Sequence, residues 1–291
     1  MIENLLIVGS TGTIGSNALN YFVSKGISAF HTSRKKNLSS RNHIYFDLND
    51  LDDLASIPLY GITHAVICAG INGRQECESN LKSSLHTNVT RTIELINYFY
   101  SNKIFVIFLS TSLVFDGTKA LPTISDPTAP TSQYALQKAT VEDYVLKNIP
   151  NEVAIIRPTK IISNNDVLFR NWLFNILDNK SFKASTILNI SPLGIDFFLQ
   201  CLHAVLANKI SGIVQISPTY QVTYYQLALK MASLLGKPTS FIAPNYNLIN
   251  YEFKPYVYTN LASNIQDLTH INLPTPYDFL EDFISNNLKL P

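Results

Sequence analysis

Tyr134 and Lys138 are the pair of residues in this sequence best suited to acid–base chemistry. Residues four apart lie on one face of a helix, so the phenol and the ammonium group can point into the same cleft. A neighbouring cation favours the phenolate, and we expect Lys138 to lower the pKa of Tyr134 toward neutrality. Thr111, within the hydroxyl-rich stretch Ser110–Ser112, could hold a carbonyl oxygen beside that phenol. The spacing alone is common and is also compatible with a structural pair.

A glycine-rich turn near the start of the chain has the composition of a phosphate-binding loop. Glycines recur every third residue directly after the apolar run Leu5–Val8. They let the backbone turn tightly and approach a pyrophosphate, while free N–H groups at a helix start attract its negative charge. A purely structural turn is the alternative. The residues expected to bind a dinucleotide here are Gly9, Thr11, Gly12, Thr13, Ile14 and Gly15.

The end of the second expected strand indicates which dinucleotide is bound. An NAD-selective site usually has an acidic residue at this position, whereas this chain has Ser33, Arg34 and Lys35. Hydroxyl and basic side chains suit the extra phosphate of NADP, so we expect NADP(H) to be preferred, with NAD(H) possible. A solvated basic loop is the alternative. Asp47 and Leu48 follow the next apolar stretch and could contact the adenine, or form a simple turn.

Small residues at the end of the third major strand complete the expected cofactor site. Cys68, Ala69 and Gly70 would let a cofactor lie against the backbone. Asn88 is a polar residue inside an amphipathic stretch, and we assign it to the cofactor site as well. Simple exposure on the helix surface would also explain Asn88.

The elements that must position these residues alternate between short apolar runs and longer amphipathic stretches. This alternation predicts an α/β fold with a Rossmann-type, doubly wound parallel sheet and a smaller C-terminal substrate lobe. We expect strands over residues 5–8, 27–32, 64–68, 104–109, 153–156 and 213–216. Helices are expected over residues 13–24, 85–100, 133–148, 195–207, 224–235 and 277–286.

Two domains are expected from the change of rhythm after about residue 161. Residues 1–161 form the dinucleotide-binding domain, to which a segment of about 192–217 crosses back. Residues 162–191 and 218–291 form the substrate-binding lobe, in which Trp172 belongs to the core or to the wall of a cleft.

Composition and charge exclude several classes of function. The 291 residues are 46% hydrophobic and carry a net charge of +1, without a broad basic face, so we expect no nucleic-acid partner. The sequence shows no signal peptide and no apolar stretch that could cross a membrane, and three unpaired cysteines suit a reducing compartment. We therefore expect a soluble, cytoplasmic protein that binds no metal. A homodimer is left open.

Taken together, these motifs resemble the extended branch of the short-chain dehydrogenase/reductase family, and within it the dTDP-4-dehydrorhamnose reductase group. The resemblance extends over nearly the whole chain. Its specific pieces are Val114–Gly117 and Tyr134–Lys138, supported by Cys77-Glu78, Asn88-Val89, Arg157-Pro158, Ser191–Asp196 and Val222–Ala228.

This resemblance implies a role for each matching residue. Thr111 would be the catalytic hydroxyl, Tyr134 the general acid, and Lys138 its helper, which also holds the nicotinamide ribose; Arg157 would join the cofactor site. A nicotinamide would deliver hydride to a keto carbon of a nucleotide-activated deoxysugar, in polysaccharide biosynthesis, and Tyr134 would protonate the new alkoxide.

The chain also departs from the group at several positions. The usual Ser-Thr-Asp-Tyr is Ser110–Leu113 here, Ile161–Ser163 replaces a tyrosine-glycine turn, and Lys254–Leu261 follows the pattern only loosely. Three functions therefore stay open: a reductase, an epimerase or dehydratase of the same family, and a non-catalytic cofactor-binding subunit like the reductase-related partner of methionine adenosyltransferase. Dehydration generally adds an acidic pair beside the catalytic hydroxyl, which this chain lacks.

Overall fold

The chain folds into two compact units in a computed structural model that describes residues 2, 4–36, 41–49, 54, 57, 59, 61–149, 151–247 and 256–289. The first unit comprises Met1–Phe115, Pro127–Arg157 and Leu199–Val214. The second comprises Asp116–Asp126, Pro158–Phe198 and Gln215–Pro291. It thus includes residues 116–126, which the sequence analysis assigned to the dinucleotide-binding domain. Lys254 and Pro255 lie outside the described residues.

A seven-stranded sheet forms the centre of the first unit, with the strand order β11-β6-β5-β4-β1-β2-β3. The strands are β1 (Asn4–Val8), β2 (Ser28–Ser33), β3 (His43–Tyr45), β4 (His64–Ile67), β5 (Phe105–Leu109), β6 (Val153–Pro158) and β11 (Gly212–Ile216). The pairs from β6 across to β3 are parallel. The order 3-2-1-4-5-6 is that of the Rossmann fold, so the predicted doubly wound parallel sheet is confirmed.

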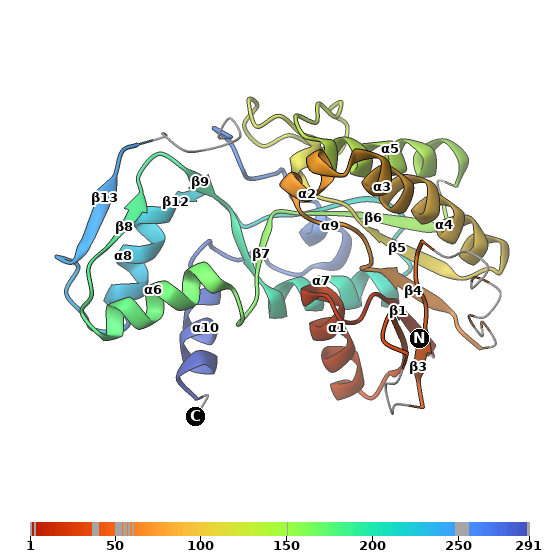
Figure 1. Ribbon diagram of the computed structural model, residues 1–291, viewed down its shortest axis with the longest axis horizontal. Helices are drawn as coiled ribbons and strands as arrows, with labels where there is room; N and C mark the ends of the chain where they lie inside the picture. Colours follow the sequence, from red (N-terminus) through yellow and green to blue (C-terminus); the bar gives the residue numbers. More distant parts are fainter. Residues whose placement is uncertain are drawn as a thin grey trace. The chain divides into compact units, whose positions relative to one another are not determined.

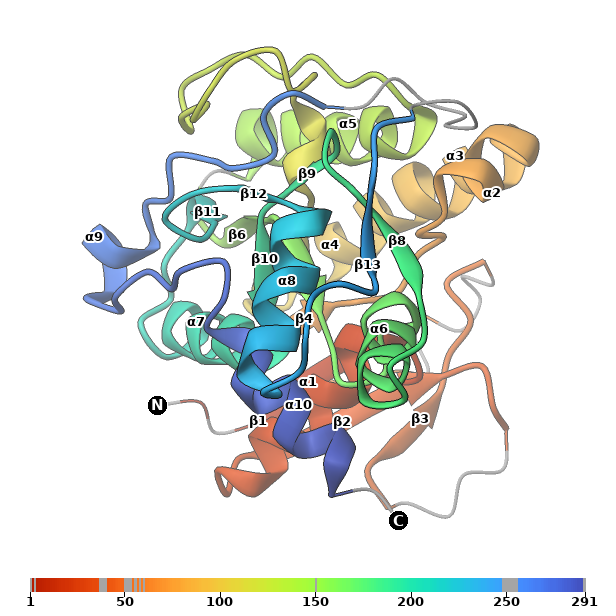
Figure 2. The same ribbon diagram turned by 90° about the vertical axis from the view of Figure 1, so that its left-hand side faces the viewer.

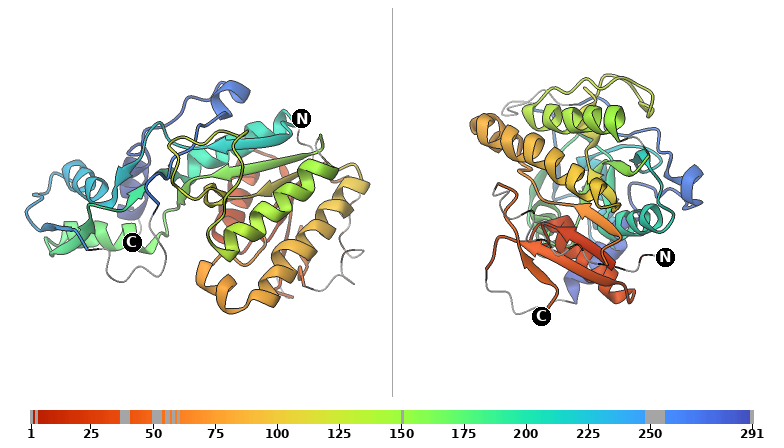
Figure 3. Two further views of the ribbon diagram at one scale, coloured as in Figure 1. Left: turned by 90° about the horizontal axis from the view of Figure 1, so that it is seen from above. Right: turned by 90° about the vertical axis from the view of Figure 1, so that its right-hand side faces the viewer.

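Helices cover both faces of this sheet (Figures 1 and 3). On one face lie α1 (Thr13–Ser24) and α7 (Ile195–Ala207). The other face carries α2 (Arg74–Ser79), α3 (Leu81–Leu85), α4 (Thr92–Ser101) and α5 (Gln133–Asn148). The single helix expected over residues 85–100 is interrupted by a π-helical segment, η2 (His86–Arg91), which places Asn88 at a widened turn.

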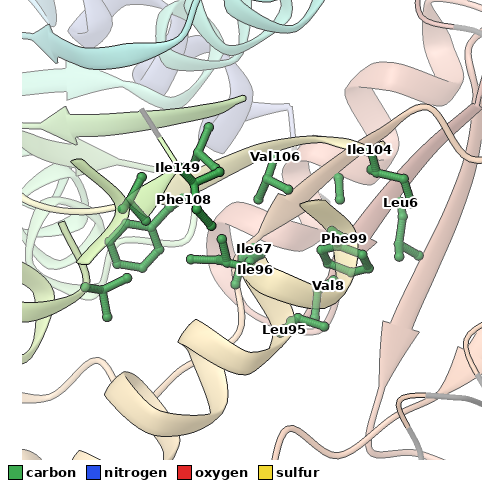
Figure 4. Packing of buried hydrophobic residues seen from close by; sticks show 14 of the residues in the cluster. Leu6, Val8, Ile67, Leu95, Ile96, Phe99, Ile104, Val106, Phe108 and Ile149 are labelled. Atoms are coloured by element: carbon green, nitrogen blue, oxygen red, sulfur yellow. The ribbon is translucent and has the colours of Figure 1, made fainter. Parts of the chain in front are cut away.

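The core of the first unit lies between α4 and the sheet (Figure 4). Every residue of β5 is buried, which explains its continuous apolar run, because a central parallel strand is covered on both faces. The α4 side chains Leu95, Ile96 and Phe99 are fully buried against this sheet. The sheet is therefore a rigid platform whose strand ends can hold functional groups in place.

The second unit is built from helices and short strand pairs around its own apolar core (Figure 2). Its helices are α6 (Val167–Leu177), α8 (Tyr224–Leu234), α9 (Ile265–Thr269) and α10 (Phe279–Leu288). Its strand pairs are β7 (Lys160–Ile162) with β10 (Pro192–Gly194), β9 (Asn189–Ile190) with β12 (Val222–Thr223), and β8 (Phe182–Ser185) with β13 (Ile242–Asn245). Trp172 belongs to this core, with its ring stacked on Phe182 at a centroid distance of 5.7 Å.

None of the helices in the described part of the chain combines the length and the apolar character that crossing a membrane requires.

Candidate functional site

The glycine turn lies between β1 and α1 and leaves the start of α1 open. Gly12 is the N-cap residue, no side chain caps the helix, and its first turn contains no acidic residue. The first N–H groups of the helix therefore keep their hydrogen-bonding capacity, and together with the helix dipole they can hold an anion. Thr11, Gly12 and Thr13 are exposed and Ile14 is half-buried. This arrangement suits the pyrophosphate of a dinucleotide.

Close backbone contacts explain two of the three glycines. Gly9 has a φ of +88°, and a Cβ added there would lie 2.7 Å from the backbone nitrogen of Ala69. A Cβ on Gly15 would lie 2.3 Å from the carbonyl oxygen of Gly9. At Gly12 the nearest atom would be 3.7 Å away, which is an ordinary contact. Gly9 and Gly15 therefore shape the turn, whereas Gly12 leaves room above it.

At the end of β2, one hydroxyl side chain is buried and the two basic side chains that follow it are exposed. Ser33 is buried, where its Oγ lies 2.8 Å from His43 Nε2 and accepts a hydrogen bond from the backbone of Lys35 at 3.2 Å. Arg34 and Lys35 are exposed. The two basic side chains are thus accessible to a phosphate. The Ser33 hydroxyl, by contrast, is hydrogen-bonded to His43 and so links β2 to β3.

Asp47 and Leu48 lie in the turn that follows β3. Asp47 Oδ1 accepts hydrogen bonds from the backbone and the side chain of Asn49, at 3.0 and 3.3 Å. Leu48 is buried in the core of the first unit. The structure thus gives Asp47 the turn-forming role that was the alternative, and contact of either residue with an adenine stays a prediction.

The loop after β4 consists of small residues, and Cys68, Ala69 and Gly70 are half-buried. Gly70 has a φ of +154°, and a Cβ there would lie 3.1 Å from Asn88 Oδ1. Ala69 packs against Gly9 of the phosphate-binding turn. Burial raises the pKa of the Cys68 thiol to about 12, so this side chain stays neutral and acts as an apolar wall.

Asn88 is 3% exposed and clamps this loop, so the reading of Asn88 as a surface residue is wrong. Its Oδ1 accepts from the Ile71 backbone at 2.8 Å, and its Nδ2 donates to the Ile71 carbonyl at 2.9 Å. The same Nδ2 donates to Gln137 Oε1 at 2.7 Å, and Gln137 donates to Ser84 Oγ at 2.8 Å. This buried network ties the loop after β4 to α5. Direct contact of Asn88 with a cofactor stays a prediction.

Tyr134 and Lys138 share one face of α5, directed at the end of β5. Lys138 Nζ donates to the carbonyl of Leu109 at 2.8 Å, and lies 4.8 Å from the ring centre of Phe108. The same ammonium lies 5.9 Å from the ring centre of Tyr134. Thr111 follows two residues after Leu109 and is buried, with its Oγ1 accepting from the next turn. The Lys138 ammonium thus lies at the carboxyl end of a central strand, where ligands of such sheets bind, and Tyr134 is on the same face of α5.

The expected lowering of the Tyr134 pKa is wrong. Burial raises the pKa of Tyr134 to about 12; the charge of a Cys77 thiolate would raise it further, and the Arg74 guanidinium lowers it. Burial also lowers the pKa of Lys138 to about 8, against the opposing effects of Cys68, Glu142 and Cys77. Desolvation outweighs charge for both groups. At neutral pH the site therefore holds a protonated phenol beside a protonated amine.

Arg157 is 2% exposed and is engaged by a carboxylate rather than open to a cofactor. Its Nη2 lies 2.6 Å from Glu142 Oε2, and its Nε donates to both carboxylate oxygens at 3.0 and 3.1 Å. Its guanidinium also lies 5.1 Å from the ring centre of Phe115. The charged group of Arg157 thus forms a buried ion pair, and contact of Arg157 with a cofactor stays a prediction.

Glu142 and Gln137 are the two site residues that sequence reasoning missed. Both lie on α5, both are fully buried, and both hold neighbouring functional residues through hydrogen bonds. The signal was present in the spacing. Lys138 and Glu142 are four residues apart, so a polar stripe continues along the face of α5 that carries Tyr134.

Comparison with known proteins identifies the family. Residues 5–171 match the model of the NAD dependent epimerase/dehydratase family. The chain belongs to this family, and it is accordingly an NAD(P)-dependent enzyme of the oxidoreductase type, as the sequence motifs predicted. It has no significant match among the curated proteins compared with it.

Solved structures share the fold over nearly the whole chain, at low sequence identity. A dTDP-4-dehydrorhamnose reductase from Bacillus anthracis, in complex with NADP, has a TM-score of 0.85 and 15% identity, covering 98% of this chain and 99% of its own. A UDP-N-acetylglucosamine 4-epimerase from Bacillus cereus has a TM-score of 0.82 and 17% identity, covering 98% and 99%. A dTDP-glucose 4,6-dehydratase from Bacillus anthracis, in complex with NAD, has a TM-score of 0.80 and 17% identity, covering 99% and 97%.

Proposed function

We propose that this protein is an NADPH-dependent reductase of a keto group on a nucleotide-activated deoxysugar. The observation that carries the proposal is the position of Tyr134 and Lys138 on one face of α5, where Lys138 donates a hydrogen bond to the end of β5. The bound nicotinamide would supply hydride, and Tyr134 would give its proton to the oxygen of the reduced carbonyl. Thr111 would hold that oxygen beside the phenol. Among proteins of this fold, the dTDP-4-dehydrorhamnose reductase has the same chemistry in its name.

The protonation states favour reduction over a reaction that begins with oxidation. A pKa of about 12 keeps Tyr134 protonated at neutral pH, as a proton donor must be. Oxidation of an alcohol instead needs a base that removes the hydroxyl proton, and a phenol with this pKa is a poor one. An epimerase remains the second candidate, because the family model and one fold relative carry that activity in their names. An epimerase that regenerates its own cofactor would retain it through purification, and a reductase would release it.

We assign the phosphate groups of the cofactor to backbone and side-chain groups that are exposed in the structure. The turn around Gly12 would hold the pyrophosphate, and Arg34 with Lys35 would bind the 2′-phosphate of NADPH. Lys138 would hold the nicotinamide ribose, while the second unit would bind the nucleotide sugar. A cytoplasmic location and a homodimer stay predictions. The intact set of Thr111, Tyr134 and Lys138 argues against a non-catalytic regulatory subunit.

The test is Tyr134→Phe, measured as NADPH oxidation against a panel of nucleotide 4-keto-6-deoxysugars. Loss of the proton donor should lower kcat by about 10²- to 10⁴-fold while NADPH still binds. Tyr144→Phe is the matched control, since the hydroxyl of this tyrosine on the same helix exchanges hydrogen bonds with Asn97, at 2.8 and 3.0 Å. A fully active Tyr134→Phe enzyme would refute the mechanism. Failure of the wild-type protein to oxidise NADPH with any member of the panel would refute the reductase.

A further inference from the structure

A buried carboxylate joins three segments of the candidate site. Glu142 on α5 is 1% exposed and accepts hydrogen bonds from Arg157 at the end of β6, through Nε and Nη2. It also accepts a hydrogen bond from Ser110 Oγ at the end of β5. One side chain thus connects α5, β5 and β6 beneath the residues assigned to chemistry.

Stability alone gives no reason for an ion pair at this position. Removing a carboxylate and a guanidinium from water costs several kcal/mol for each ion, and well-packed apolar residues of similar volume are often as stable or more so. The location of the pair is more informative. Glu142 follows Lys138 by one helical turn, and its partner Ser110 immediately precedes Thr111.

We propose that Glu142 is a positioning residue of this site, which keeps the Lys138 ammonium charged and fixes the strand end that carries Thr111. Arg157 balances the charge of the carboxylate and holds its orientation through a bidentate contact. This inference rests on the proposed function, because it gives Lys138 and Thr111 the roles they have there.

The groups that act on Lys138 come from three elements. Cys68 follows β4, Cys77 lies on α2, and Glu142 lies on α5 with Tyr134. Burial raises the pKa of both thiols, so they stay neutral at physiological pH. Among the described groups that raise the pKa of Lys138, Glu142 is therefore the one that carries a negative charge. Without it, burial would lower the pKa of Lys138 further below its present value of about 8.

The effect should be measured as the alkaline limb of the pH profile of kcat/KM, together with the pH dependence of NADPH binding followed by NADPH fluorescence. Glu142→Gln keeps the size of the side chain and removes its charge. Removal of the negative charge lowers the pKa of Lys138 further, so we expect both limbs to move to lower pH than in the wild type, by about one unit. Asp143→Asn is the matched control, because this exposed neighbour forms its ion pair with Lys147 at the surface.

A double variant, Glu142→Leu with Arg157→Met, protects the test against a folding defect, because it leaves no unpaired buried charge. The alkaline limbs of this variant should also lie at lower pH than those of the wild type. The shift should be smaller than in Glu142→Gln, because in that variant the unpaired Arg157 guanidinium remains and lowers the pKa of Lys138 further. If either folded variant binds NADPH normally and its pH profiles match those of the wild type, the positioning role is refuted. The proposed function would still stand. Wild-type protein that binds neither NADPH nor NADH would instead overturn the proposed function itself.

Discussion

Alanine at Gly15 should destabilise the first unit, against the usual effect of this substitution. In a helix interior, glycine to alanine normally stabilises by about 1 kcal/mol. Here the new Cβ would lie 2.3 Å from the Gly9 carbonyl oxygen and 3.0 Å from Ser10 Cα. Both atoms belong to the backbone, so no side-chain rotation relieves the clash. Forcing an extra group into a packed site costs about 1–3 kcal/mol, and a backbone clash at 2.3 Å belongs at the upper end. Subtracting the usual gain of about 1 kcal/mol leaves an expected net loss of about 2 kcal/mol.

The assay is urea unfolding followed by far-UV circular dichroism, with a melting curve beside it. A loss of this size should lower Tm by about 5 °C. Gly12→Ala is the control, because its Cβ would have 3.7 Å to the nearest atom and its φ of −76° suits any residue. Its stability should fall by less than about 1 kcal/mol, the difference between glycine and alanine at an N-cap. NADPH binding should weaken at least about tenfold, since the methyl group would lie where the pyrophosphate is expected. Wild-type stability of Gly15→Ala would refute the close approach, and tight NADPH binding by Gly12→Ala would refute the phosphate-binding role.

Two further substitutions test the clamp and the cofactor preference. Asn88→Ala removes the partner of the Ile71 N–H and one of the two hydrogen bonds that the Ile71 carbonyl accepts, the other coming from the Cys77 thiol. An unsatisfied N–H costs about 1–3 kcal/mol, so the urea midpoint should fall; an unchanged midpoint would contradict the clamp. Arg34→Ala combined with Lys35→Ala should weaken NADPH binding about tenfold or more and leave NADH binding unchanged, because only NADPH carries the 2′-phosphate. Equal losses for the two cofactors would contradict this assignment, and Lys147→Ala, an exposed lysine of α5, provides the control.

The elements with a strong periodic pattern could be predicted closely from the sequence. Helices α1, α5 and α7 begin and end at the residues expected, and the apolar run of β5 lies within the expected range. Gly26 follows α1 with a φ of +75°, the glycine conformation that commonly ends a helix, whereas β6 runs on to Pro158, past the expected end at residue 156. By contrast, α6 was not expected, since its aromatic residues are crowded together and its apolar positions do not form a single clear stripe. The division of the helix near Asn88 depends on hydrogen bonds across the fold, which no local pattern contains.

The candidate site could be predicted in part for a related reason. Residues at the ends of parallel strands meet at one edge of the sheet, so the glycine turn, Cys68 and Thr111 could be grouped from the sequence. The partner of a buried charge cannot be read in this way. Arg157 matched a motif, but its role depends on Glu142 reaching it from another element. Sequence spacing identifies the side chains, and packing decides which of them face a ligand.

The pKa of Tyr134 shows how burial changes the chemistry that spacing suggests. A lysine four residues away favours a phenolate, but its ammonium is bonded to the Leu109 carbonyl and lies 5.9 Å from the ring centre. Removal of the phenol from water acts in the opposite direction and is the larger effect. The same burial makes Lys138 easier to deprotonate, to a pKa of about 8. Between neutral pH and that value the site holds two proton donors, and reduction of a carbonyl is the direction of reaction that such a pair can support without a prior proton loss.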